Sequence, residues 1–324
     1  MFSINEYSRL RKVIVGDASG SKVPSIDLSA RCVNYSDKLL KADIPKAGPY
    51  PKQVIEEANE DIDIFVDFLE QENIVVLRPD KNFEPAYSKF CPRDSIFVHG
   101  ENSLFAPMAI RSRQHEHEAY KKILVDTKQM KINRKDSLYN DSCVGNKNIL
   151  ALNEDEPCFD AANVLKDNNH VYYLVSNSGN VKGANSLQNI LGQTAKVEKI
   201  EGVYSYMHLD STLAFLREGL VLVNPSRVKD KSQLPSPLQK HDIIYAPEPV
   251  DIGYYGDYCN SSAWINVNLL SIDEKLVVLE ENQHNLRKIL EQHGIECAML
   301  PMRHARTLGG CFHCVTIDLE RDNV

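Results

Sequence analysis

Hydrophobic and polar positions alternate over four pairs of short segments, and each pair is joined by a turn that contains Gly, Asn or Asp. Such alternation predicts β-hairpins. After most hairpins, apolar residues three or four positions apart predict a helix, or a further short apolar segment predicts a third strand. We expect hairpins over 94–108, 160–175, 208–224 and 262–281, helices over 111–124, 183–193 and 282–294, and third strands over 196–200, 241–247 and 295–300.

A fifth unit of this kind is divided between the two ends of the chain. Strands are predicted over 10–17 and 314–324, with a helix over 51–72 and a strand over 73–79. A repeated unit indicates a stacked or radial architecture, and a unit shared by both ends closes a ring without open edges. We therefore predict that residues 1–324 form a single domain. Its expected fold is a five-bladed α/β propeller of pseudo-symmetric ββαβ units, closed by the N- and C-terminal segments.

Polar or reactive residues stand about seven positions before each predicted turn, near the start of the first strand. They are Asp94, Asp160, His208 with Asp210, Ser261 with Ser262, and Cys314. Polar residues begin roughly half of all such strands on general surface grounds. Carboxylates, a histidine and a cysteine at the same offset are harder to explain that way. If five equivalent strands line a central channel, these side chains meet at one of its ends.

The chain ends with two cysteines, Cys311 and Cys314, in a C-x-x-C spacing. Structural zinc usually needs a second pair of ligands, which is missing here. A thioredoxin-like motif lies at a strand-to-helix turn, whereas a strand pattern follows Cys314. A cysteine nucleophile fits better, because the preceding glycines let a ligand approach. His208 would be its acid or base and Asp160 would orient the histidine, although each alone is more often a structural residue.

Several motifs of the chain resemble those of the amidinotransferases, the family of the arginine:glycine and inosamine-phosphate enzymes. They include "CPRDSIFVHGENSLFAPMAIRSR", "EPCFDAANVL", "YMHLDST", "GLVLVNPSRV", "SSAWINVN" and "RTLGGCFHC", and they extend over nearly the whole chain. The resemblance implies the pentein fold, a five-bladed α/β propeller with ββαβ blades. It therefore agrees with the number of units deduced from the hydrophobic pattern.

The resemblance also implies roles for individual residues. Cys314 matches the nucleophile, His208 the general acid and base, and Asp160 the residue that orients the histidine. The remaining matches are to substrate contacts, namely Asp94 and Asp210 for the guanidinium and Arg227, Ser261 and Ser262 for the rest of the donor. Cys311 departs from the family, which usually carries a third glycine there. A side chain at this position could narrow the channel or let a second thiol trap Cys314.

The reaction implied is transfer of the amidino group of L-arginine through an amidino-cysteine to a primary amine, with release of ornithine. It requires no metal and no organic cofactor. The guanidinium is planar, cationic and poorly electrophilic, so carboxylates must hold it against a thiolate. Met207 precedes the histidine, as in the arginine:glycine branch, and its bulk favours a small acceptor such as glycine. Alternatives are hydrolysis, as in arginine deiminases and dimethylarginine hydrolases, and a binding propeller without activity.

Composition and charge restrict the partners. The chain is 43% hydrophobic and 25% charged, as is usual for globular proteins, and its formal net charge is −8. With no block of Lys and Arg, nucleic acid and anionic membranes are disfavoured and small-molecule substrates are expected. The N-terminus has no signal-peptide pattern and no apolar run reaches spanning length, so we expect a cytoplasmic protein with its eight cysteines reduced. Base rates for soluble enzymes favour a homodimer.

Overall fold

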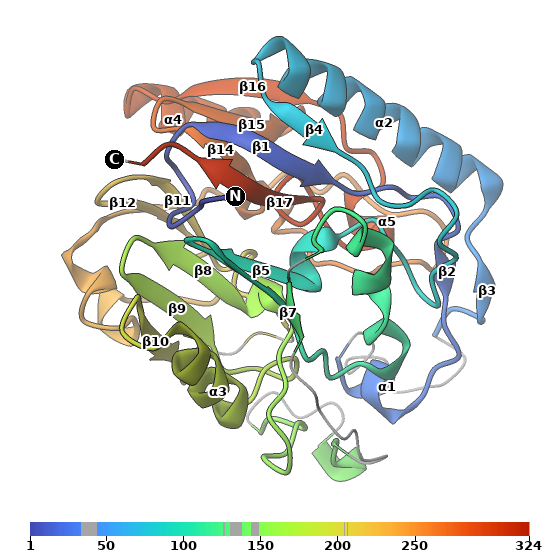
Figure 1. The fold of residues 1–324 in the computed structure, drawn as a ribbon. Coiled ribbons are helices and arrows are strands. Elements are labelled where there is room, and N and C mark those ends of the chain that lie inside the picture. The colour runs from blue at the N-terminus through green and yellow to red at the C-terminus, as the bar shows by residue number, and fades with distance from the viewer. Residues whose placement is uncertain are drawn as a thin grey trace.

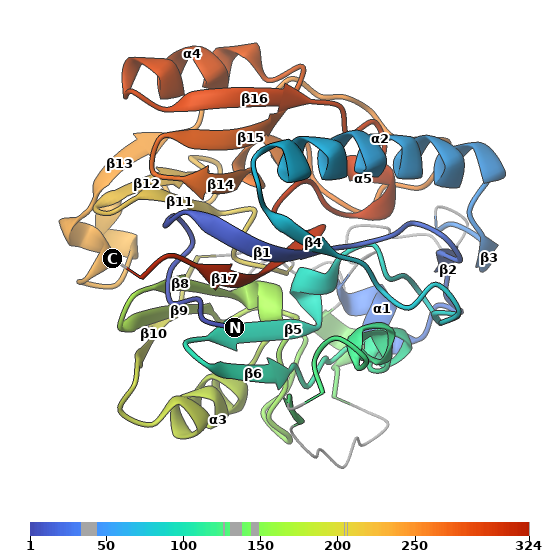
Figure 2. The ribbon, with the colours of Figure 1, turned by 45° about the horizontal axis from the view of Figure 1, so that its top comes forward.

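The computed structural model describes residues 1–33, 44–125, 127–129, 138–143, 149–203, 205 and 207–323. Within these ranges five three-stranded sheets follow one another around a common centre (Figure 1, Figure 2). Each sheet consists of an antiparallel pair and a third strand parallel to its neighbour. A two-stranded sheet of β2 (Lys22–Val23) and β3 (Gly48–Pro49) lies apart from them.

The blades take their strands in chain order, except for the one that contains both ends of the chain. This blade consists of β17 (Thr316–Arg321), β1 (Leu10–Val15) and β4 (Val75–Leu77). The other four are β5 (Ile96–His99), β6 (Asn102–Phe105) and β7 (Lys128–Gln129); β8 (Val164–Asp167), β9 (His170–Leu174) and β10 (Lys196–Ile200); β11 (Leu213–Arg217), β12 (Leu220–Val223) and β13 (Asp242–Tyr245); and β14 (Leu270–Asp273), β15 (Leu276–Glu280) and β16 (Glu296–Leu300).

In the four blades whose third-strand side chains are described, the third strand is less buried than the first. All four residues of β5 and of β8 are buried, whereas β16 has none that is fully buried. The first strands therefore lie innermost, which is the arrangement of a propeller. Since their starts carry the candidate residues, the fold brings these residues toward one end of its centre.

The helices of the described residues are α1 (Leu28–Val33), α2 (Lys52–Gln71), α3 (Val181–Leu191), α4 (His284–Gln292) and α5 (Ala305–Leu308). The three longest, α2, α3 and α4, each lie against the third strand of a sheet, β4, β10 and β16, whereas α5 is buried. The long helix α2 buries Val54, Ala58, Ile62, Phe65 and Leu69, a spacing of three and four residues that forms one apolar stripe. The predicted helices over 51–72, 183–193 and 282–294 are confirmed. Among the described residues, no helix is both long and apolar enough to cross a bilayer.

The helix predicted over 111–124 is wrong. Two 3₁₀ helices occupy this segment instead, η3 (Arg111–Arg113) and η4 (Glu116–Tyr120). Arg113 and Glu116 are both buried and paired with each other, so this segment directs charged side chains into the protein. A tight turn that places residues three apart on one side suits this pair better than an amphipathic α-helix.

Candidate active site

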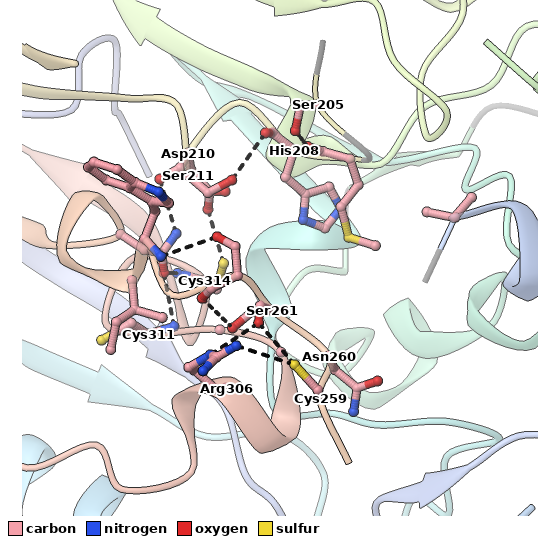
Figure 3. Close-up of a pocket in the computed structure, with 18 of the residues that line it drawn as sticks. Ser205, His208, Asp210, Ser211, Cys259, Asn260, Ser261, Arg306, Cys311 and Cys314 are labelled. Atoms are coloured by element: carbon pink, nitrogen blue, oxygen red, sulfur yellow. Dashed lines mark hydrogen bonds between the residues drawn. The ribbon is translucent and has the colours of Figure 1, made fainter. Parts of the chain in front are cut away.

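Five of the predicted site residues lie just before the innermost strands. Asp94 ends the 3₁₀ helix η2 (Pro92–Asp94) before β5, and Asp160 precedes η6 (Ala161–Asn163) and β8. His208 and Asp210 precede β11, and Cys314 precedes β17. All five are buried, with at most 5% of each residue exposed. Figure 3 shows His208, Asp210 and Cys314 around one space, approached from different elements.

The expected equivalence does not hold for the fourth blade. Ser261 and Ser262 lie well before β14 and are separated from it by the 3₁₀ helix η9 (Ile265–Val267). Asn268 instead occupies the place next to the strand start. The two serines still line the cavity of the site, so their location near the substrate space remains as predicted while their offset does not.

His208 is held by a carboxylate and by an unusual backbone conformation. Its Nε2 lies 3.0 Å from Oδ2 of Asp160, and its Nδ1 lies 3.6 Å from Oδ1 of Asp94. Its φ of 43° is in the left-handed region, which costs free energy for a residue other than glycine. The Leu209 N–H donates to the Ala162 carbonyl at 2.8 Å, which ties this turn to the Asp160 blade. The strain therefore directs the imidazole toward the carboxylates.

Cys314 is fixed from three sides. Its thiol lies 3.1 Å from Oδ2 of Asp210, and its backbone N–H donates to Oδ1 of Asn268 at 3.1 Å. A Cβ on Gly310 would lie 2.4 Å from Cβ of Cys314 and 2.9 Å from Sγ of Cys91. Such distances exclude any side chain at this position without movement of the loop. The "GG" that precedes the cysteine thus allows two thiols to lie close beside the backbone.

Carboxylates outnumber cations in this site. Arg113 donates to both oxygens of Glu116, at 3.0 and 2.8 Å, and to Oδ2 of Asp94 at 2.8 Å. It lies 4.0 Å from Oδ2 of Asp160. One buried oxygen each of Asp94, Asp160 and Asp210 has no hydrogen-bond partner among the described residues. Buried acceptors of this kind are costly, and a guanidinium with five N–H donors would satisfy them.

The pKa values of the site follow from this excess of acids. Burial alone would lower the pKa of His208, but Asp94 and Asp160 outweigh it and hold this pKa well above its ordinary value. Burial raises the pKa of Asp94, and it raises that of Glu116 to about 7. A hydrogen bond with Cys91, burial and the charge of Asp210 raise the pKa of the Cys314 thiol well above its ordinary value. These charges favour an imidazolium and a neutral thiol.

Asp210 behaves differently from the other acids. Burial would raise its pKa, but a hydrogen bond and the charge of His313 lower it to about 2. Nδ1 of His313 lies 2.9 Å from the Asp210 carboxylate. Asp210 therefore stays ionised next to the thiol.

A cavity of about 250 Å³ leads to Cys314 and includes both charged and apolar walls. Arg227 lies in it, with Nη1 2.7 Å from the hydroxyls of both Ser211 and Thr212. Arg306 lies in it as well and is paired with Asp251. The apolar wall consists of Val33, Met207, Trp264 and Ile265. Within the described ranges, no cluster of His, Cys, Asp and Glu is arranged to hold a metal ion.

Comparison with known proteins connects this geometry to a family. No protein-family model matches the chain. It is 39% identical over 336 residues to inosamine-phosphate amidinotransferase 1 of Streptomyces glaucescens, with 98% of this chain and 95% of the relative covered. The chain belongs to the amidinotransferase family. It is also 31% identical to the L-arginine:L-lysine amidinotransferase of Pseudomonas savastanoi pv. phaseolicola, with 98% and 94% covered. Glycine amidinotransferase of Gallus gallus is 30% identical, with 98% and 82% covered.

Solved structures agree with this assignment. The inosamine-phosphate amidinotransferase STRB1 of Streptomyces griseus has a TM-score of 0.94 at 37% identity, and 100% of this chain and 97% of that chain are covered. A dimethylarginine hydrolase of Pseudomonas aeruginosa has a TM-score of 0.62 at 15% identity, which shows the fold alone; 95% and 99% of the two chains are covered. The predicted fold, a five-bladed α/β propeller of the pentein class, is confirmed. Membership of the amidinotransferase family also confirms the prediction that the protein is a transferase.

Sequence reasoning missed four residues of the site. Asn268 could have been found by counting to the strand start instead of to the turn. Arg113 and Glu116 lie in the segment for which a helix is predicted, and nothing in their spacing indicates burial. Cys91 stands three residues before Asp94, and only the approach of Gly310 shows that its sulfur lies near Cys314.

Proposed function

We propose that this enzyme transfers the amidino group of L-arginine to a primary amine and releases ornithine. The observation that carries the proposal is a buried thiol beside Asp210, in a site where one buried oxygen each of Asp94, Asp160 and Asp210 has no hydrogen-bond partner among the described residues. Such a site is complementary to a flat cation with several N–H groups. Arg227 in the same cavity would bind the carboxylate of arginine.

The first half-reaction begins when the guanidinium binds between Asp94 and Asp210. Its positive charge offsets the acids that raise the pKa of Cys314 and so favours the thiolate. As the guanidinium binds, the thiol proton is released to solvent, and the thiolate left after the second half-reaction takes up a proton again. Asp210, which lies 3.1 Å from the sulfur, stays ionised throughout. The sulfur then bonds to the guanidinium carbon. As the bond from this carbon to the side-chain nitrogen of arginine breaks, the imidazolium of His208 protonates that nitrogen and ornithine departs.

The second half-reaction uses the same groups in reverse. His208, now neutral and still oriented by Asp160, takes a proton from the acceptor amine. The amine nitrogen bonds to the amidino carbon, and the bond from that carbon to sulfur breaks. Ping-pong kinetics follow, because ornithine must leave before the acceptor occupies its place. No metal or organic cofactor takes part in either half.

We infer that the acceptor is a small amine that carries a carboxylate, such as glycine. Met207 narrows the cavity next to His208, and Arg227 would bind the carboxylates of donor and acceptor in turn. The relatives named above act on inosamine phosphate, lysine and glycine according to their names, so the acceptor has to be tested directly.

Mass spectrometry of the intact protein after brief exposure to L-arginine tests the covalent step. The wild type and Cys311→Ser should gain one amidino group, whereas Cys314→Ser should not. Release of ornithine upon addition of an amine marks transfer, and citrulline with ammonia would mark hydrolysis instead. A panel of glycine, longer amino acids, lysine and a phosphorylated amino-cyclitol identifies the acceptor. Activity with the cyclitol alone would overturn the small-acceptor proposal.

A further inference from the structure

Asn268 connects three blades at the point where Cys314, the candidate nucleophile, lies next to Asp210, one of the carboxylates proposed to hold the guanidinium. It is 3% exposed and lies between η9 and β14. We propose that Asn268 is a positioning residue that sets the distance and angle between Cys314 and Asp210. This inference rests on the proposed function, since it assigns the residue a part in formation of the amidino-cysteine.

The contacts of Asn268 point in both directions. Its Oδ1 accepts hydrogen bonds from the backbone N–H of Cys311 at 2.9 Å and of Cys314 at 3.1 Å. Its Nδ2 donates to the backbone carbonyl of Asp210 at 3.2 Å. Its own carbonyl accepts from the His313 N–H at 3.2 Å. One side chain thus connects the loop 311–314 to the segment that carries Asp210.

An amide is the side chain that these contacts require. The carbonyl oxygen offers two lone pairs for the two N–H groups, and the NH₂ group supplies the donor for the Asp210 carbonyl. Aspartate would keep an oxygen that accepts from the two N–H groups, but it would lose the donor to the Asp210 carbonyl and add a charge close to the thiol. Alanine would lose all three bonds and leave two buried N–H groups unpaired.

The geometry explains why this matters for the reaction. The Cys314 thiol and the Asp210 carboxylate come from different blades and lie only 3.1 Å apart. The Asp210 carboxylate must hold the guanidinium while the Cys314 sulfur attacks it. A displacement of about 1 Å at such a site can reduce the rate by about 100-fold. Binding of arginine, in contrast, depends on the carboxylates. Asn268 contacts only the backbone of Asp210 among them, so its loss should affect binding less than the rate.

Asn266 provides a matched control, because it lies two residues away in η9 and is fully buried. Its Nδ2 donates to the carbonyl of Pro247 at 3.1 Å. Alanine at either position removes a buried amide from the same loop. Of the two, Asn268 is the one whose side chain bonds to the loop 311–314.

The test measures three quantities for Asn268→Ala and Asn266→Ala: the single-turnover rate of amidino-cysteine formation, the arginine concentration at half-maximal rate, and Tm. We expect Asn268→Ala to lower the rate about 100-fold with the half-maximal concentration changed less than about threefold. Asn266→Ala should keep the rate within about twofold even if its Tm falls equally. Equal rate losses in both variants would overturn the proposal.

Two further measurements keep the outcome unambiguous. If Asn268→Ala does not fold, Asn268→Asp keeps a side-chain oxygen that accepts from the N–H groups of Cys311 and Cys314, and we expect a rate at least about tenfold below wild type; an unchanged rate would overturn the role. Alkylation of Cys314 by iodoacetamide without arginine tests positioning independently of the proposed function. We expect its rate to differ from wild type in Asn268→Ala but not in Asn266→Ala, whereas failure of the proposed function would show as no amidino adduct in wild type.

Discussion

Two clusters of buried charges lie along the innermost strands, and their composition differs. The site cluster contains the carboxylates Asp94, Glu116, Asp160 and Asp210 with Arg113 and His208. The closed cluster contains Glu6, Arg93, Lys166, Asp318 and Arg321. The first has four carboxylates around one guanidinium and one imidazole, whereas the second has three cations around two carboxylates.

The residues of the closed cluster do not line the cavity that leads to Cys314, and their charges are paired with one another. Asp318 lies 2.9 Å from Nη1 of Arg93, 2.7 Å from Nζ of Lys166 and 3.2 Å from Nε of Arg321. Burial and Asp318 would raise the pKa of Glu6, but Lys166 and Arg93 lower it to about 2. The pKa of Asp318 is also well below its usual range, since the three cations outweigh its burial.

The difference separates a structural cluster from a binding site. In the site cluster, burial raises the pKa of Asp94 and of Glu116, whereas in the closed cluster the cations outweigh burial and lower the pKa of Glu6 and of Asp318. The site cluster keeps acids that repel one another, and such repulsion is reduced when a cation binds. His313 joins the two, with Nδ1 2.9 Å from Asp210 and Nε2 3.4 Å from Glu6. The low pKa of Asp210 is thus caused by His313, the residue that also contacts the closed cluster.

The largest expected effect is on activity alone. Cys314→Ser should reduce amidino transfer by about 10⁴-fold or more, because a hydroxyl is a far weaker nucleophile than a thiolate near neutral pH. Arginine should still bind, since the carboxylates remain. Isothermal titration with arginine and an ornithine assay measure the two effects. Cys311→Gly is the control, with activity expected within about threefold of wild type; dependence on Cys311 instead of Cys314 would show that the assignment is wrong.

A pair of isosteric substitutions tests the comparison itself. Asp318→Asn leaves three buried cations without their shared carboxylate, so unfolding should become easier by about 3–5 kcal/mol. Asp94→Asn removes a charge that burial already disfavours and leaves Arg113 paired with Glu116, so stability should fall less than in Asp318→Asn. It should instead weaken the donor half-reaction by the worth of a charge-assisted contact, about 1.5–3 kcal/mol. Urea unfolding and single-turnover rates measure both. Equal stability losses would refute the distinction.

Opposite pH dependences are expected for Glu6 and Glu116. A carboxyl with a pKa lowered from 4.5 to about 2 contributes stability that is present above pH 4.5 and lost as the pH falls toward 2. A carboxyl with a pKa raised to about 7 makes the folded state bind the proton more tightly, so its contribution is lost as the pH rises from 4.5 through 7. Glu6→Gln should flatten the free energy of unfolding below pH 4.5, and Glu116→Gln should flatten it between pH 4.5 and 7. The same slope in both variants would contradict this assignment.

The sequence allowed prediction of the features that depend on local patterns. Alternation and turn residues located the hairpins, and the position of Asp94, Asp160, Asp210 and Cys314 before their first strands placed them together. Pairing between distant charges could not be predicted in this way. Arg113 reaches Asp94 over nineteen residues and Lys166 reaches Asp318 over more than a hundred, so both clusters exist only after the blades have closed.

The smallest expected effect lies outside both clusters, on the cavity wall. Met207 lies beside His208 and lines the space that ornithine would vacate. Met207→Ser removes apolar bulk without changing any charge, so stability and the rate of attack on arginine should stay close to wild type. A bulkier amine should gain about tenfold in kcat/KM, because a change of this size in a pocket is worth about 1–3 kcal/mol. Competition between glycine and a larger ω-amino acid, measured for wild type and variant, determines the ratio. If the ratio does not change, or if the variant loses the donor half-reaction, Met207 belongs to the catalytic arrangement rather than to the wall that selects the acceptor.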